Sequence, residues 1–352
     1  MYEPKYSITN IILKYIGIIE GSKQVIDNAP LLPYYEKKFQ QEAMVRSVYH
    51  GTHLEGNELN KTQAEKVLEG QEIIARERDI QEVINYRRVM DFIGEEFAKT
   101  PEREQPKVNE SLIKKLHALT VEKILSPDRC GQFRTSQVVV KNSQTGQVSF
   151  RPPQASEVEP GIKDLISFIQ KTSSDDLHPV LKSGIVHYEL VRIHPFVDGN
   201  GRVARALSTL ILFQEGYDIR KFFSLEEYFD HDAIAYYEAL QSVGKSGELT
   251  KWLEYFCKGL AIELSKIKDK VEKISVDSKL KAKLGGRPLL LTERQIKIIE
   301  YIQETNYLQN NAFASLFPMV SEDTVLNDLK VLIKAGLIKK TGKTKAAKYV
   351  ME

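Results

Sequence analysis

Residues 190–205 read Leu190-Val-Arg-Ile-His194-Pro-Phe-Val-Asp198-Gly-Asn-Gly-Arg202-Val-Ala-Arg205. An apolar helical run ends at His194, a turn rich in Asp, Gly and Asn follows, and a second apolar run begins with the two arginines. Unpaired N–H groups at a helix N-terminus and the helix dipole both favour an anion. The stretch therefore predicts two helices joined by an anion-binding loop.

Charged side chains of this loop favour a nucleotide phosphate as the anion. Arg202 and Arg205 lie one helical turn apart, so both side chains can face the same anion. Asp198 is a hard oxygen ligand beside them, which suits Mg²⁺. His194 can exchange a proton near neutral pH. Together these residues predict a nucleotide-phosphate site that carries its own base.

The composition is that of an ordinary globular protein. The 352 residues are 42% hydrophobic and 28% charged, which fits two or three domains, and a formal net charge of +2 does not by itself imply nucleic acid or membrane. Cys130 and Cys257 form neither a disulfide framework nor a zinc site, which favours a reducing compartment. The apolar segment 8–19 is too short to cross a bilayer. We expect a cytoplasmic protein without a membrane segment.

Apolar residues recur with helical periodicity along most of the chain, so the expected fold class is mainly α. The clearest exception is β-rich sequence at 133–140 and 147–150, separated by a turn at 142–146, which predicts a hairpin. Residues 101–106 and 279–288 are expected to be a loop and a linker. Expected helices lie at about 35–54, 60–70, 72–99, 109–125, 157–171, 179–193, 230–243 and 248–274.

The C-terminal residues predict a separate small unit. Expected helices at 292–305, 311–317 and 321–335 are followed by a basic hairpin around Gly342. Three helices and a hairpin in some sixty residues resemble a winged helix-turn-helix.

The motif from His194 to Arg205 resembles the signature of the Fic (filamentation induced by cAMP) domain family, with every defining position filled. The resemblance covers about residues 106–260. It implies a Fic-type helical core with a β-hairpin flap, preceded by a helical region and followed by the winged helix-turn-helix. The implied domains are an N-terminal region carrying an inhibitory motif at 1–105, a catalytic core at 106–262, a connecting helix and linker at 263–286, and the winged helix at 287–352.

The resemblance implies a protein adenylyltransferase that moves AMP from ATP, with Mg²⁺, to a Tyr, Ser or Thr hydroxyl of a target protein and to itself. Relatives that phosphorylate carry Lys where this chain has Gly201, so glycine favours nucleotidyl transfer. Positioning and charge neutralisation are what this chemistry needs most. The implied roles are base for His194, metal ligand for Asp198, anion hole for Gly199, Asn200 and Gly201, and phosphate binding for Arg202 and Arg205.

Two further surfaces follow from the family pattern. Val140, Tyr237 and Leu240 are expected to line the adenine pocket, although Gly244 stands where some relatives have an Asn that contacts the base. The flap strand 137–140 is expected to pair with an extended target segment by β-augmentation, with an ordinary surface hairpin as the equal alternative.

The sequence His53-Leu-Glu55-Gly-Asn57 resembles the inhibitory motif that some family members carry before the Fic core. There the glutamate pairs with the second motif arginine, here Arg205, and competes with phosphate for its guanidinium. The family's Ser or Thr four positions before the glutamate is Gly51 here. The alternative for Glu55 is an exposed side chain at a helix end.

A second function stays open: a nucleotide-sensing transcriptional regulator whose winged helix binds DNA. Acidic Glu322, Asp323 and Asp328 on the expected recognition helix are poor chemistry for DNA, so a protein-interaction or dimerisation module is slightly favoured and a homodimer stays open. A different nucleotide donor is the third alternative. His187 is expected to be a packed core histidine. The lysines that could neutralise phosphates are Lys339, Lys340, Lys343, Lys345 and Lys348.

Overall fold

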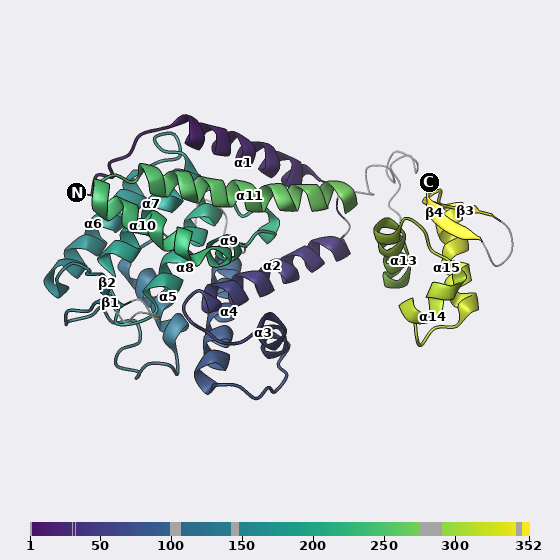
Figure 1. Ribbon diagram of the computed structural model, residues 1–352, viewed down its shortest axis with the longest axis horizontal. Coiled ribbons are helices and arrows are strands. Elements are labelled where there is room, and N and C mark those ends of the chain that lie inside the picture. The colour runs from purple at the N-terminus through teal and green to yellow at the C-terminus, as the bar shows by residue number, and fades with distance from the viewer. Residues whose placement is uncertain are drawn as a thin grey trace. The chain divides into compact units, whose positions relative to one another are not determined.

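Helices make up most of this computed structural model, which describes residues 2–29, 31, 33–98, 107–141, 148–274, 291–342 and 347–352. The expected mainly α class is confirmed (Figure 1). Contacts divide the chain into one unit of Met1–Asp27 and Phe39–Ile267 and another of Asn28–Lys38 and Lys268–Glu352. The four-part division stays a prediction. The expected loop at 101–106, hairpin turn at 142–146 and linker at 279–288 lie outside the described residues.

Most of the helices lie wholly or mainly in the first unit, and the first residues of α2 and the last of α11 belong to the second. Their bounds are α1 (Asn10–Asn28), α2 (Pro33–His53), α3 (Lys61–Leu68), α4 (Glu77–Ala98), α5 (Glu110–Val121), α6 (Val158–Lys171), α7 (Pro179–Ile193), α8 (Asn200–Gln214), α9 (Leu225–His231), α10 (Ala233–Ser246) and α11 (Thr250–Ile274), with short 3-10 helices η2 (Ala155–Glu157) and η3 (Ile219–Lys221).

The expected helix 230–243 is present as α10, which begins at Ala233 rather than at residue 230 because the chain breaks between α9 and α10. Asp232 stands at the break with φ −137° and ψ 75°, and its side chain accepts a hydrogen bond from Ala235 N at 3.0 Å. An aspartate that satisfies a helix N-terminus in this way starts a new helix, although the apolar spacing runs through it.

The centre of the first unit is the pair α7 and α8, which pack along each other and are buried over most of their lengths (Figure 1). In both helices most residues are buried and many are apolar, as is expected for helices inside a protein rather than on its surface. α11 packs tightly on α7, where Trp252 Nε1 donates to Gly184 O at 2.7 Å. A Cβ on Gly184 would lie 3.0 Å from Leu253, so glycine permits this close approach. The loop 195–199 is therefore held between two rigid helices.

The expected hairpin is shorter than the sequence suggested. β1 (Val140–Lys141) pairs antiparallel with β2 (Val148–Phe150), and Val140 is opposite Phe150. Residues 133–139 lie outside the strand, and at the start of this segment the Phe133 ring packs against the loop, 5.5 Å from the ring of Phe196.

The second unit has the expected order of three helices and a hairpin. Its apolar core includes Ile302, Leu329 and Tyr349. Identification as a winged helix-turn-helix stays a prediction, and Lys343 and Lys345 lie outside the described residues. The elements are α13 (Glu293–Thr305), η4 (Asn310–Ala312), α14 (Phe313–Leu316), α15 (Glu322–Lys334), β3 (Ile338–Thr341) and β4 (Lys348–Met351), with Ile338 opposite Met351 in the antiparallel pair.

Asp328 of α15 faces the interior of the second unit. Its carboxylate is buried and accepts hydrogen bonds from Gln295 Nε2 at 3.0 Å and from Arg294. Asp328 therefore does not contribute negative charge to an exposed surface, unlike the expectation from sequence. Separately, no helix among the described residues is long and apolar enough to cross a membrane.

Candidate active site

The motif loop begins where α7 is forced to end. His194 has φ 50° and ψ 60°, a left-handed conformation that stops the helix, and Pro195 follows it. Gly199, with φ 78°, then precedes α8, and glycine adopts this angle without steric cost. The loop thus turns the chain between two buried helices.

Asn200 closes this loop with its side chain. Its Oδ1 accepts from Phe196 N at 2.9 Å, and its Nδ2 donates to Phe196 O at 2.9 Å. Both polar ends of the amide are thus used inside the protein. The expected contribution of Asn200 to an anion hole is limited to its backbone N–H, because the side chain is committed to the loop.

The N-terminus of α8 carries the predicted anion-binding groups. Its first intrahelical bond runs from Val203 N to Gly199 O at 3.0 Å, so the N–H groups of residues 200–202 precede the helical ladder. The N–H of Gly199 donates to Asp198 Oδ1 at 2.6 Å. The anion position is covered by Glu55, whose Oε1 lies 2.1 Å from where a Cβ of Gly201 would be.

The predicted ion pair between Glu55 and Arg205 is present. Arg205 is 2% exposed, and its Nη2 donates to Glu55 Oε1 and to Gly51 O, each at 2.8 Å. Burial acts to lower the pKa of Arg205, but Glu55 and nearby tyrosines outweigh it, so the pKa lies well above its ordinary value. Nε and Nη1 of Arg205 have no hydrogen-bond partner among the described residues.

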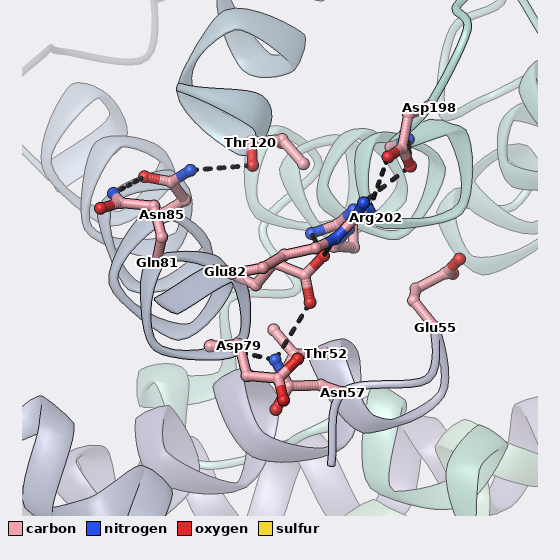
Figure 2. Close-up of polar contacts among 12 residues, drawn as sticks. Thr52, Glu55, Asn57, Asp79, Gln81, Glu82, Asn85, Thr120, Asp198 and Arg202 are labelled. Atoms are coloured by element: carbon pink, nitrogen blue, oxygen red, sulfur yellow. Dashed lines mark hydrogen bonds and ion pairs between the residues drawn. The ribbon is translucent and has the colours of Figure 1, made fainter. Parts of the chain in front are cut away.

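Arg202 and Asp198 are paired with α4, as Figure 2 shows for Glu82 and Arg202. Nη1 of the buried Arg202 lies 3.3 Å from Glu82 Oε1, and its Nη2 lies 3.5 Å from Asp198 Oδ1. Arg78 Nη2 donates to Asp198 Oδ2 at 2.8 Å, and Arg78 Nε donates to Glu82 Oε1 at 3.1 Å. The cationic Arg202 and the anionic Asp198 of the motif therefore each have a partner of opposite charge on α4.

Sequence reasoning missed Arg78 and Glu82. Both resemble the solvated charges of an amphipathic helix, and their spacing of four residues gives an ordinary intrahelical pair. Asn57 joins them to the Glu55 turn: its Nδ2 donates to Glu82 Oε2 at 3.0 Å and to Asp79 O at 3.0 Å (Figure 2). The nearest signal in the sequence is the position of Asn57, two residues after Glu55.

His194 has the arrangement of a neutral base. Its Nδ1 lies 3.3 Å from Val191 O, which favours a proton on Nδ1 and leaves Nε2 as the acceptor. Burial lowers the pKa of the imidazole, so the neutral form dominates near pH 7. A neutral, partly shielded imidazole at the edge of an anion site can accept a proton from a hydroxyl.

His117 of α5 is a third residue that sequence reasoning missed. Its ring stacks on Phe196 with centroids 3.8 Å apart and planes 1° apart. Gly131 N donates to its Nδ1 at 2.9 Å, so Nε2 carries the proton and donates to Asp198 O at 3.1 Å. Burial lowers the pKa of His117 to about 4. His117, which is neutral near pH 7, therefore supports the loop from α5.

The other predicted residues have separate locations. His187 is buried, and its Nε2 lies 2.9 Å from Tyr236 Oη, so its assignment as a core histidine is confirmed. Tyr237 Oη donates to Leu54 O at 3.3 Å, which places this ring beside the Glu55 turn. Leu240 is buried in α10 and Val140 starts β1. An adenine pocket formed by Tyr237, Leu240 and Val140 stays a prediction.

Comparisons with known proteins address this region. Residues 107–212 match the Fic/DOC family model. The chain is 29% identical over 183 residues to protein adenylyltransferase fic-1 of Caenorhabditis elegans, covering 51% of this chain and 34% of that protein. It is 30% identical over 200 residues to protein adenylyltransferase Fic of Drosophila virilis, covering 51% and 35%. The chain thus spans about a third of the length of these relatives.

Solved structures share the fold. A Fic family protein from Desulfovibrio desulfuricans G20 has a TM-score of 0.67 at 21% identity, covering 100% of this chain and 98% of that chain. Fic-1 from Caenorhabditis elegans has a TM-score of 0.59 at 24% identity, covering 75% and 74%. The chain therefore has a mainly helical Fic fold, contains a Fic/DOC family domain, and is distantly similar to protein adenylyltransferases.

Proposed function

We propose that this protein is an adenylyltransferase that transfers AMP from ATP to a hydroxyl side chain of a target protein and to itself, and that Glu55 inhibits it. The observation that carries the proposal is that the buried Arg205 and the first turn of α8 meet at a position covered by the Glu55 carboxylate, with the buried Arg202 on the same turn of the helix. An anion is the ligand that this set of donors suits.

The donors fit the phosphates of a nucleotide. Nε of Arg202 and both Nε and Nη1 of Arg205 are buried and lack hydrogen-bond partners among the described residues, while Nη1 of Arg202 lies 3.3 Å from Glu82 Oε1. Buried guanidinium N–H groups that lack partners are costly, and phosphate oxygens satisfy them in the geometry that arginine prefers. The first-turn amides of α8 add further donors on the same side of the loop.

The motif also fits Mg²⁺ held jointly with phosphate. No group of three or more His, Cys, Asp or Glu among the described residues could hold a metal. Mg²⁺ is commonly held by one or two carboxylates together with substrate phosphates, and Asp198 supplies one carboxylate beside the anion position. Asp198 would hold the ion, which when bound neutralises phosphate charge.

His194 would take the proton from the attacking hydroxyl at Nε2. The hydroxyl oxygen then forms a bond to the α-phosphorus of ATP, the bond between this phosphorus and the β-phosphate bridging oxygen breaks, and pyrophosphate leaves. Arg202 and Arg205 would hold the outer phosphates, which carry the developing charge. We include in the proposal that β1 holds the target segment by strand pairing.

Inhibition follows from competition for one guanidinium. Nη2 of Arg205 is occupied by Glu55 Oε1 at 2.8 Å, and this carboxylate lies over Gly201. A carboxylate and a phosphate cannot occupy the same donors together, and their like charges repel. Displacement of Glu55 is therefore needed before the outer phosphates bind productively.

Labelling with ATP carrying a labelled α-phosphate tests the proposal. With Mg²⁺, the variant Glu55→Gly should self-label strongly and the wild type weakly, while Glu55→Gly combined with His194→Ala should not label. Mass spectrometry should find one adenylyl group per modified hydroxyl and identify the residue. Competition among ATP, GTP and UTP then identifies the donor. Equal labelling of wild type and Glu55→Gly would contradict inhibition, and no labelling of either would contradict the transfer.

A DNA-binding regulator is the second candidate. The exposed lysines of β3 and β4 face solvent, and the inward position of Asp328 removes one negative charge from the expected recognition helix. Binding of the full chain to random duplex DNA should then weaken steeply as salt rises, and Lys339→Gln with Lys340→Gln should reduce this dependence. Absence of salt-dependent binding would leave the second unit as a protein-interaction module.

A further inference from the structure

We infer that Arg134 is a positioning residue that fixes the base His194 and both ends of the β1–β2 hairpin relative to each other. The inference rests on the proposed function, because it concerns the distance between the base and a target segment held on β1. Arg134 lies outside the 194–205 motif and is 3% exposed.

One side of Arg134 holds the end of α7. Its Nε donates to His194 O at 2.8 Å, its Nη2 lies 3.4 Å from Ile193 O, and its backbone N donates to Pro195 O at 2.8 Å. These three carbonyls belong to His194 and its two chain neighbours. The left-handed conformation of His194 is thereby supported from outside the helix.

The other side of the guanidinium holds the hairpin. Nη1 donates to Ser136 O at 3.1 Å, and Nη2 donates to Pro153 O at 2.6 Å. Ser136 precedes β1 and Pro153 follows β2, so the two ends of the hairpin are joined to the same group. The distance from β1 to His194 is consequently set by one planar side chain.

Arginine is the side chain that this role requires. The four hydrogen bonds that the structure gives to the guanidinium go to backbone carbonyls of three chain segments, so its charge is buried without a carboxylate among these partners. Burial lowers the pKa of Arg134 accordingly. A guanidinium presents its donors in a fixed plane, whereas the ammonium of lysine is a single point on a flexible chain.

A displacement of the base relative to the target hydroxyl acts on the transfer step and not on nucleotide binding. Misplacement by about 1 Å can reduce a rate by about 100-fold. In the Glu55→Gly background, Arg134→Lys and Arg134→Gln should therefore lower kcat by about 10- to 100-fold. The Kd for a fluorescent ATP analogue should change less than about twofold, because the donors of α8 are intact. Guanidinium ion added to Arg134→Ala should restore part of the lost rate.

The matched control is Arg129→Gln, which removes an exposed arginine from the same loop region. It should leave kcat, Kd and the midpoint of thermal unfolding unchanged. If kcat of Arg134→Lys equals that of Arg129→Gln, or falls only in proportion to the folded fraction, positioning is contradicted.

Hydrogen exchange separates this inference from the proposed function, because it needs no turnover. In Arg134→Gln, amides of residues 194–199 and of β1 should lose protection together, by at least about tenfold, while amides of α11 should not. If protection is lost in only one of the two segments, Arg134 does not support both of them, and the inference is contradicted. If Glu55→Gly fails to label, the proposed function fails, and joint loss of protection would still establish that Arg134 couples the hairpin to the motif.

Discussion

The carboxylate of Glu55 lies where a side chain on Gly201 would begin. Glu55 Oε1 is 2.1 Å, and Arg205 Nη1 is 3.2 Å, from the position of a Cβ on residue 201. Glycine at this position therefore leaves room for the Glu55–Arg205 pair as well as for an anion. The family resemblance related Gly201 to the choice of chemistry, and the structure adds that glycine accommodates the contact between Glu55 and Arg205.

Gly201→Ala should displace Glu55 and weaken its pair with Arg205. Because Glu55 is the far end of a flexible side chain, the loss should be about 1 kcal/mol in the free energy of unfolding, at the low end for overpacking. In the Glu55→Gly background, Gly201→Ala should lower the free energy of unfolding by clearly less, because the Glu55 side chain is absent. A double-mutant cycle by urea unfolding measures the difference. Equal costs in both backgrounds would show that the methyl group does not meet Glu55.

Arg78→Ala should lower the Mg²⁺ concentration needed for tight nucleotide binding. Arg78 Nη2 is 2.8 Å from Asp198 Oδ2, so its guanidinium competes with a cation for this carboxylate. Exposed ion pairs contribute about 0.2–1 kcal/mol, which corresponds to a decrease of up to about fivefold in the Mg²⁺ midpoint. A fluorescent ATP analogue titrated with Mg²⁺ reports the midpoint without turnover.

The control is Arg76→Ala. Arg76 lies two residues away and pairs with Asp79 and Glu58, so its loss should leave the Mg²⁺ midpoint unchanged. If Arg78→Ala and Arg76→Ala give the same midpoint, Arg78 does not compete for Asp198.

Glu82→Gln should destabilise the protein without a nucleotide and increase its stabilisation by a nucleotide. The substitution keeps the shape of Glu82 but removes the negative charge 3.3 Å from the buried Arg202. Breaking a buried ion pair at one partner typically costs about 3 kcal/mol. Bound phosphate replaces the lost charge, so ATP should raise the Tm of Glu82→Gln more than that of the wild type. A smaller rise in Tm for Glu82→Gln than for the wild type would show that phosphate does not replace the charge of Glu82.

The rate of labelling should decrease in acid below the ordinary pKa of histidine. Burial lowers the pKa of His194 from 6.5, so the neutral base persists at pH 6.5 and is protonated only at lower pH. The acid limb of kcat/KM in Glu55→Gly, which reports the free enzyme, should thus have its midpoint below pH 6.5 after correction for the folded fraction. A midpoint above 6.5 would mean that another group controls the rate.

Folding stability should also decrease in acid. His117 has a pKa lowered to about 4, so the folded protein binds this proton less readily than the unfolded chain. The contribution to the free energy of unfolding is complete above pH 6.5 and is lost as pH falls toward 4, by about 1.4 kcal/mol per pH unit. Urea unfolding of wild type and His117→Gln at pH 7 and pH 5 should show a smaller pH dependence in the variant.

The helices and the motif could be predicted from the sequence because both depend on which residues are near each other along the chain. Apolar spacing predicted α7 and α8, and the turn residues predicted their junction near His194. The break at Asp232 was missed because a local hydrogen bond of one side chain outweighed an unbroken apolar pattern.

The chain by itself determined which residues form the candidate site, since His194, Asp198, Arg202 and Arg205 belong to one continuous segment, 194–205. The tertiary structure decided what each of them contacts: Glu55, Arg78, Glu82 and Arg134 are distant in sequence and meet the motif only after the helices pack. The physical reason is that a charged residue on a helix has the same local pattern whether it faces water or a buried partner. Only the packing of α2, α4 and the hairpin ends around α7 and α8 decides which charged residues face water and which face a buried partner.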